Sequence, residues 1–160
     1  PRVGLMNVGE EPGKGNDLAK ETYPLLEQTP GIVFAGNVEG RDVLAGAADV
    51  IVMDGFVGNV LLKFGESLKG ALPQMMGAAV QRLGLDAAQH EAMTQVLAAV
   101  GKGFDYESAG GAPLLGVAGN VVIGHGSSSA KAIASMIRAG AAMAEAGVAP
   151  ALAEALAPTA

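Results

Sequence analysis

Short apolar runs alternate with segments of helical periodicity at the start of the chain. Residues 3–8, 32–35 and 50–53 are apolar runs of strand length, and each is followed by glycine or a polar side chain. A helical pattern, capped by Asn16 or Asp17, separates the first two runs, and a short helix is expected before the third. This alternation predicts an α/β fold with a mainly parallel sheet and helices on its faces.

The chain becomes strongly helical after Asn59. Apolar residues then recur at three- and four-residue steps, and Pro73 within this run is expected to kink or split the helix. Asp86 and Gln89 have the spacing of a capping box and predict the start of a second helix. Together, residues 60–101 predict an antiparallel helical hairpin that projects from the sheet domain.

The last third of the chain returns to short apolar runs separated by glycine. Residues 104–106 and 121–123 predict short strands, with a glycine-rich turn at 110–116 between them. A helix is expected over 129–144, followed by a short helix in the Ala- and Pro-rich tail. Neither an internal repeat nor a second core pattern is visible, so we interpret residues 1–160 as a single α/β domain.

Composition describes a globular chain and excludes several kinds of site. Half of the 160 residues are apolar, 24 are glycine and none is cysteine, which excludes disulfides, thiol catalysis and thiolate metal sites. The histidines, His90 and His125, lie far apart, and we expect neither a metal nor a cofactor. A net charge of −6 argues against nucleic-acid binding, so an anionic ligand requires a local positive site.

Targeting signals are not evident in the sequence. No signal peptide is visible, and residues 108–130, although free of Asp, Glu, Lys and Arg, contain too many glycine and polar residues for a membrane helix. The chain has no initiator methionine and enters a strand at once. We therefore expect it to be a piece of a longer protein.

Polar groups collect in four loops that follow predicted strands. If the strands are parallel, these loops meet at one edge of the sheet, where ligands bind and helix N-termini add positive potential. This set of groups suits a phosphate, but the P-loop and G-x-G-x-x-G motifs are absent, and no Ser/His/acid triad stands out. The candidate residues are Lys14, Asn16, Asn37, Arg41, Asp54, Gly55, Gly58, Asn59, His125, Ser127 and Ser128.

These loops resemble the bacterial phosphate acyltransferase family PlsX. The resemblance runs from residue 3 to about residue 139, in order and in spacing, and rests on residues 9–11, 14–16, 36–42, 54–60, 110–116 and 125–128. It implies an enzyme that makes acyl-phosphate from acyl-[acyl carrier protein] and inorganic phosphate for phospholipid synthesis. It also implies a three-layer Rossmann-like fold, similar to phosphate acetyltransferases and isopropylmalate-type dehydrogenases, of which this chain is the C-terminal half.

The resemblance assigns catalytic roles to Lys14 and Asn59. Lys14 would supply positive charge for phosphate, and Asn59 an amide donor for phosphate or for the oxyanion of the tetrahedral intermediate. The other loop residues would bind substrate. Phosphate itself is the nucleophile, so no serine or cysteine nucleophile is required.

Other roles for the same residues stay open when the residue types are taken alone. Lys14 is also typical of a solvated surface lysine, and Asn59 is a good helix cap. Asp54 either caps a helix or orients Lys14 or a water. His125 suits proton transfer or a structural hydrogen bond, and the serines that follow it suit N-cap positions.

The resemblance also implies a cytoplasmic homodimer at the inner face of the membrane. The hairpin would then pack in the core or a dimer interface, or would contact the membrane through Leu72, Met75, Met76, Ala79, Val80 and Leu83. Its few basic residues, Lys63, Lys69 and Arg82, would attract anionic lipid only modestly, or would meet an acidic carrier protein instead.

Two other classes of function were weighed. A dehydrogenase of the related fold requires paired aspartates for a divalent metal and an adenine-binding loop, and neither is found in the sequence. A non-catalytic phosphate-binding module is favoured if this chain exists alone.

Overall fold

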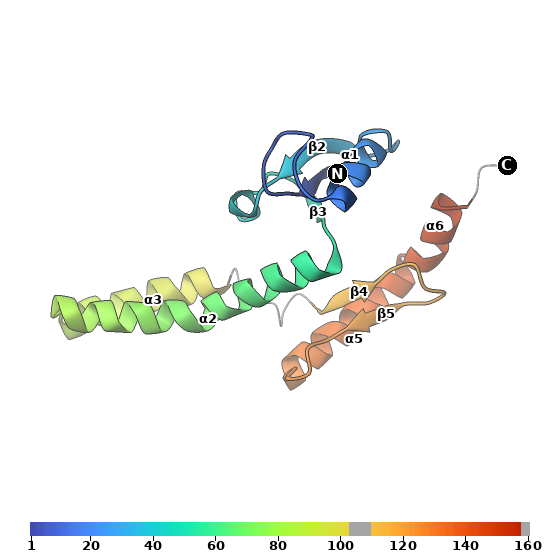
Figure 1. Ribbon diagram of the computed structural model, residues 1–160. Coiled ribbons are helices and arrows are strands. Elements are labelled where there is room, and N and C mark those ends of the chain that lie inside the picture. The colour runs from blue at the N-terminus through green and yellow to red at the C-terminus, as the bar shows by residue number, and fades with distance from the viewer. Residues whose placement is uncertain (103–109, 158–160) are drawn as a thin grey trace. The chain divides into compact units, whose positions relative to one another are not determined.

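The computed structural model describes residues 1–102 and 110–157, and strands and helices alternate at its start as the apolar pattern predicts (Figure 1). The chain divides into two units, Pro1–Met75 and Met76–Ala160. Each unit contains one small sheet. The fold class is therefore α/β, as expected.

The first unit is built on a parallel sheet of three strands in the order β2-β1-β3. The strands are β1 (Arg2–Met6), β2 (Val33–Val38) and β3 (Val50–Val52). Val3 and Leu5 of the central strand are buried, as is Val38 at the end of β2. The predicted parallel arrangement is confirmed for these strands, and their carboxyl ends share one edge.

Helix α1 (Asp17–Glu27) packs against β1 and β2. Its N-cap is Asn16, whose side-chain oxygen accepts a hydrogen bond of 2.9 Å from the backbone N–H of Ala19. Tyr23 of α1 meets Phe34 of β2 edge to face, with ring centroids 4.9 Å apart. The predicted cap at Asn16 is confirmed.

Strand β2 is longer than the apolar run predicts. It continues through Asn37 to Val38 because, after a shift in register between Val3 and Leu5, these residues pair with Leu5 and Met6 of β1. The N–H of Asn7 also donates to the carbonyl of Val38 over 2.9 Å. Asn37 therefore lies in the strand, and the expected exit loop begins only after it. The rest of that loop forms the single 3-10 turn η1 (Gly40–Asp42).

Helix α2 (Gly55–Leu83) begins earlier than the sequence pattern predicts. The carboxylate of Asp54 accepts hydrogen bonds from the backbone N–H groups of Phe56 and Val57, at 2.8 and 3.1 Å, and so caps the helix. Pro73 does not split the helix, which continues to its end with the proline inside it.

The second unit begins within α2, and α3 (Ala87–Lys102) follows after a short turn. Asp86 and Gln89 exchange side-chain hydrogen bonds of 2.9 Å with each other's backbone N–H, so the predicted capping box is confirmed. Val80 is buried. It is therefore not part of an exposed apolar face on the predicted hairpin.

The rest of the second unit contains a two-stranded sheet of β4 (Ala112–Leu114) and β5 (Val121–Ile123), with α5 (Ala130–Glu145) and α6 (Val148–Ala155). The four polar loops meet at one edge only if their strands are parallel, and β5 has no parallel partner among the described strands. Strands β4 and β5 pair antiparallel because the connection between them is too short for a parallel crossover. The predicted strand at 104–106 lies outside the described residues.

No single helix of the described residues is both long and apolar enough to cross a bilayer. Helices α5 and α6 meet the criterion together, but they are bent by 52° where they join.

Candidate active site

A cavity of about 460 Å³ lies at the carboxyl ends of β1 and β3. Asn16 and Asp54, which cap α1 and α2, both line it. Two helix N-termini therefore border one cavity at the edge of the sheet where α/β folds bind ligands. Most other lining residues are apolar: Leu5, Met6, Val8, Leu18, Ala19, Val52, Met53 and Val57.

Each of the two helix N-termini carries a carboxylate. Asp54 places one at the start of α2, which offsets the positive end of that helix dipole. Asn16 caps α1 with a neutral amide, and Asp17 follows it in the first turn, where it pairs with Lys20 at 4.0 Å. A nearby cation is therefore needed to hold an anion at either helix start.

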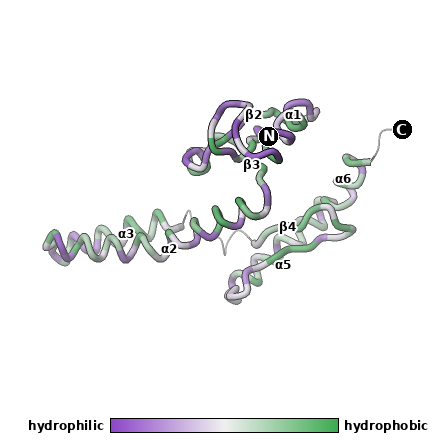
Figure 2. Tube along the Cα trace, in the orientation of Figure 1, coloured by the Kyte–Doolittle hydropathy of each residue, from purple (hydrophilic) through white to green (hydrophobic). Residues whose placement is uncertain are grey.

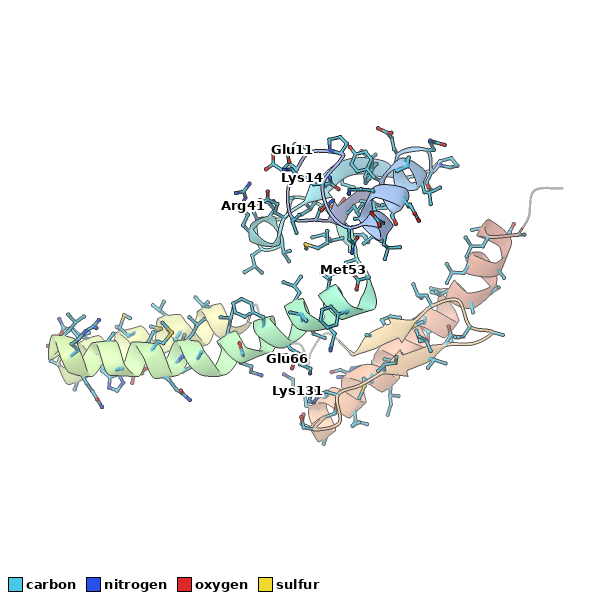
Figure 3. All side chains as sticks on the ribbon, viewed as in Figure 1. Glu11, Lys14, Arg41, Met53, Glu66 and Lys131 are labelled. Atoms are coloured by element: carbon cyan, nitrogen blue, oxygen red, sulfur yellow. The ribbon has the colours of Figure 1, made fainter. Side chains whose placement is uncertain are left out.

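The polar loop at residues 9–15 leads into α1 and carries Lys14. Figure 2 shows it as a hydrophilic segment between apolar β1 and the helix. The Lys14 side chain is exposed and runs close to Gly9, where an added Cβ would stand 3.1 Å from Lys14 Cγ. Glu11 and Lys14 extend from this same loop (Figure 3).

Lys14 makes no ion pair with a carboxylate of residues 1–102 and 110–157. Among the described residues of the first unit, ion pairs are made by Arg2, Lys20, Arg41 and Lys63, and none by Lys14. Its ammonium charge is thus available to an anion at the start of α1.

The loop is held by two asparagines. Asn7 Nδ2 donates to the carbonyl oxygen of Lys14 and to Asn37 Oδ1, both at 3.0 Å. Asn37 Nδ2 in turn donates to the carbonyl oxygen of Glu11 over 2.7 Å. Asn37 is buried, and these bonds give it a structural part in the site, whereas its predicted contact with substrate stays a prediction.

Asn7 was not among the residues predicted for the site. A signal for it was nevertheless present, because it directly follows the buried strand β1, as Asp54 closely follows β3. In α/β folds, a polar residue at the carboxyl end of a parallel strand lies at the edge of the sheet where ligands bind.

Arg41 is surrounded by acidic groups. Its guanidinium lies 3.2 Å from Glu39, 3.2 Å from Glu10 and 3.8 Å from Asp42. The charge of Glu39, with the hydrogen bond from Glu10 and the charge of Asp42, raises the pKa of Arg41 above its usual value. Because its charge is balanced, the geometry does not favour the predicted role of Arg41 in phosphate binding, which stays a prediction.

Asn59 lies on α2 beyond the first turn, with an exposed side chain. Asp54 provides the cap, so the alternative interpretation of Asn59 as the cap is wrong. Within the described part of the chain, the structure gives the Asn59 amide no hydrogen bond. Gly55 and Gly58 occupy the first turn of the same helix, and Gly58 lies beside Met53.

His125, Ser127 and Ser128 belong to the second unit. His125 Nδ1 and Ser127 Oγ lie 2.7 Å apart, and Ser128 Oγ donates to the His125 carbonyl over 2.6 Å. The N-cap of α5 is Ser129, whose Oγ accepts from Ala132 N–H, so the interpretation of the two preceding serines as caps is wrong. Their predicted contact with substrate stays a prediction.

No group of three or more carboxylates and histidines in residues 1–102 and 110–157 is placed to hold a metal ion.

Comparison with known proteins identifies the family. Residues 1–151 match the family described as "Fatty acid synthesis protein". The chain belongs to this family. Members similar to it include the phosphate acyltransferase of Salinibacter ruber, at 52% identity over 155 residues, and those of Heliobacterium modesticaldum and Aquifex aeolicus, each at 49% over 138 residues. The resemblance to the PlsX phosphate acyltransferases is thereby confirmed.

The chain accounts for only part of these family members. The alignments cover 97%, 86% and 86% of this chain but 46%, 41% and 41% of the relatives, in the same order. The chain thus spans less than half the length of these relatives.

Loss of the Asp54 cap is expected to weaken the fold. Asp54→Ala removes the acceptor of two backbone N–H groups and should lower the free energy of unfolding by about 1 kcal/mol, measured by urea denaturation. Asp54→Asn keeps a capping oxygen and is the matched control, with a much smaller loss. Equal losses for both variants would contradict the capping role.

Proposed function

We propose that the full-length protein is an acyltransferase that forms acyl-phosphate from acyl-[acyl carrier protein] and inorganic phosphate, for phospholipid synthesis. The observation that carries this proposal is Lys14, a lysine without an ion pair among the described residues, in the loop that leads to the N-terminus of α1. Membership of a family that includes phosphate acyltransferases supports the same conclusion.

The proposal extends to the architecture. A three-layer Rossmann-like domain, similar to phosphate acetyltransferases and isopropylmalate-type dehydrogenases, would be completed by sequence outside this chain, with residues 1–160 in one domain. The parallel β2-β1-β3 sheet with α1 packed against it supports this arrangement.

The reaction needs no nucleophilic side chain. Phosphate has a second pKa of about 6 to 7, so much of it is dianionic at neutral pH. One of its oxygens attacks the thioester carbonyl carbon to give a tetrahedral oxyanion. The carbon–sulfur bond then breaks, and the carrier-protein thiolate leaves and takes up a proton. The enzyme must bind phosphate, orient it and stabilise the oxyanion.

A charged group and a hydrogen-bond donor perform different parts of these tasks. Lys14 and the start of α1 hold the phosphate and balance its charge. Asn59 donates an amide N–H to the oxyanion or phosphate. The apolar wall of the cavity accommodates the acyl part of the thioester. The remaining substrate-binding proposals are Asn16, Asn37, Arg41, Asp54, Gly55, Gly58, His125, Ser127 and Ser128.

The activity can be tested directly. The full-length protein is incubated with acyl-[acyl carrier protein] and phosphate, and acyl-phosphate is trapped with hydroxylamine as the hydroxamate. Phosphate-dependent hydroxamate is the expected product, and its absence would reject the proposal. The same assay on residues 1–160 tests whether this part of the chain is active alone.

We also propose that the protein works as a cytoplasmic homodimer that contacts the membrane surface through the hairpin. The support is the exposure of large apolar side chains on α2, among them Leu62, Phe64, Met75 and Leu83. Exposed apolar side chains of this kind are suited to contact with a second subunit or with lipid.

Leu83→Glu is expected to weaken membrane association. Leu83 is 66% exposed at the end of α2, so the new charge would oppose insertion without disturbing buried contacts. Flotation of the full-length protein with anionic liposomes should show less bound variant than wild type. Gln81→Glu adds the same charge at an exposed polar position and is the control, and equal flotation of wild type and Leu83→Glu would reject membrane contact at this site.

A further inference from the structure

We propose that Asn7 is a positioning residue for catalysis, because its carboxamide holds the loop that carries Lys14, with Asn37 as its support. This inference rests on the proposed role of Lys14 in the acyltransferase reaction. It concerns how the lysine is placed, and it assigns Asn7 no contact with the substrate.

Every polar hydrogen of the Asn7 side chain has a partner. Its Nδ2 donates to the Lys14 carbonyl and to Asn37 Oδ1, each at 3.0 Å. Its Oδ1 accepts from Val8 N–H at 2.8 Å, which fixes the direction of the amide. If the amide were flipped, its oxygen would face the carbonyl oxygen of Lys14 and its nitrogen would face the backbone N–H of Val8. This hydrogen-bond pattern therefore admits only one orientation.

Asn37 anchors this amide to the sheet. It is buried near the end of β2 and paired in register with Leu5 of β1. Its Oδ1 accepts from Asn7, and its Nδ2 donates to the carbonyl of Glu11 at 2.7 Å. The loop is thus fastened at Glu11 and at Lys14, on both sides of its Pro12-Gly13 segment, to two neighbouring strands.

The backbone at Gly15, next to Lys14, leaves room for the Asn7 side chain. Gly15 has φ +92°, in the left-handed region that favours glycine. A Cβ at this position would collide with Asn7 Oδ1 and would lie 3.0 Å from the Ala19 Cβ. The chain therefore passes close over the Asn7 amide, and the hydrogen bond to the Lys14 carbonyl depends on that close passage.

Only an asparagine meets these requirements at this position. Aspartate has the same shape but offers no N–H donor, alanine offers no polar atom, and glutamine is longer by one methylene group. Loss of the two donated bonds leaves the Lys14 carbonyl without its tether. A displacement of about 1 Å in a catalytic group can cost on the order of 100-fold in rate.

The test compares Asn7→Asp, Asn7→Ala and Asn37→Asp in the full-length protein. Each Asn7 variant is expected to lower kcat for acyl-phosphate formation by roughly 10- to 100-fold. Asn37→Asp keeps the acceptor for Asn7 and loses only the bond to Glu11, so a smaller loss is expected. Thr29→Ala, which removes a side-chain-to-backbone hydrogen bond at the far end of α1, is the matched control and should keep the wild-type rate.

The decisive measurement is a double-mutant cycle with Lys14→Ala. If Asn7 acts by positioning Lys14, Asn7→Asp should lower the residual rate of the Lys14→Ala protein by less than about threefold. A full additional loss in that background would overturn the proposal, as would a wild-type rate for both Asn7 variants. A merely structural asparagine would reduce the rate equally in both backgrounds.

The outcomes separate this inference from the proposed function. If Lys14→Ala leaves the rate unchanged, the assigned role of Lys14 fails. If Lys14→Ala greatly lowers the rate while the Asn7 variants keep the wild-type rate, only the positioning role fails. Circular dichroism and thermal melting accompany each assay, and failure of all three asparagine variants to fold would overturn the proposal, because the pair would then serve the fold and not the loop.

Discussion

Lys14→Ala in the full-length protein is expected to lower the rate of acyl-phosphate formation by about 100-fold or more. The ammonium of Lys14 makes no ion pair among the described residues, so its charge is free to balance phosphate and the negative charge of the transition state. Because the side chain is exposed, its removal should leave the melting temperature nearly unchanged. The KM for phosphate should rise as well, since the lysine holds the nucleophile in the ground state too.

The matched control for this substitution is Lys20→Ala. Lys20 is exposed on α1 and lies 4.0 Å from Asp17, an ion pair of the kind that contributes little to stability. Its loss removes the same net charge from the same unit but should leave kcat and KM as in wild type. A comparable fall in rate for both lysine variants would show that overall charge matters and would reject a specific role for Lys14.

Asn59→Ala is expected to lower kcat by about 100-fold, with little change in KM for phosphate. The loss of one oxyanion donor has an effect of this size in other acyl-transfer enzymes, and it acts on the transition state more than on the bound substrate. Asp54 provides the helix cap, so Asn59→Ala should not loosen the start of α2. Steady-state kinetics together with thermal melting separate the two effects.

Gln74→Ala provides the control on the same helix. Gln74 is an exposed amide of α2, away from its N-terminus, so its removal should leave kcat unchanged. A near-normal kcat for Asn59→Ala would refute the oxyanion role. A raised KM with normal kcat would assign the amide to ground-state binding of phosphate.

Local sequence rules predicted helix starts, because a capping residue contacts backbone groups only a few positions away along the chain. Asn16, one of the two predicted caps of α1, and the pair of Asp86 and Gln89 cap their helices, whereas Ser129 caps α5 in place of the two serines before it. The parallel pairing of β1, β2 and β3 also followed from the alternation of strands and helices. In each case the contact joins near neighbours or follows from a general constraint on connections.

The apolar pattern did not predict strand ends and strand partners that depend on contacts between residues far apart in the sequence. The apolar run ends before Asn37, but β2 continues through Asn37 because that residue pairs with β1. The run at Val121–Ile123 correctly predicted a strand but not its antiparallel partner β4. The start of α2 was placed too late, although a helix cap was one of the roles left open for Asp54.

The sequence by itself determined the family to which this chain belongs, through the order and spacing of loops such as those around Lys14 and Asn59. The tertiary structure decided how the lysine loop is held, because the bond between Asn7 and Asn37 joins residues thirty positions apart. It also showed that Arg41 is paired with three carboxylates, while Lys14 has no ion pair in the part of the chain that the structure describes. Periodicity and local propensity report on neighbours along the chain, whereas these contacts exist only once parallel strands place their carboxyl ends side by side.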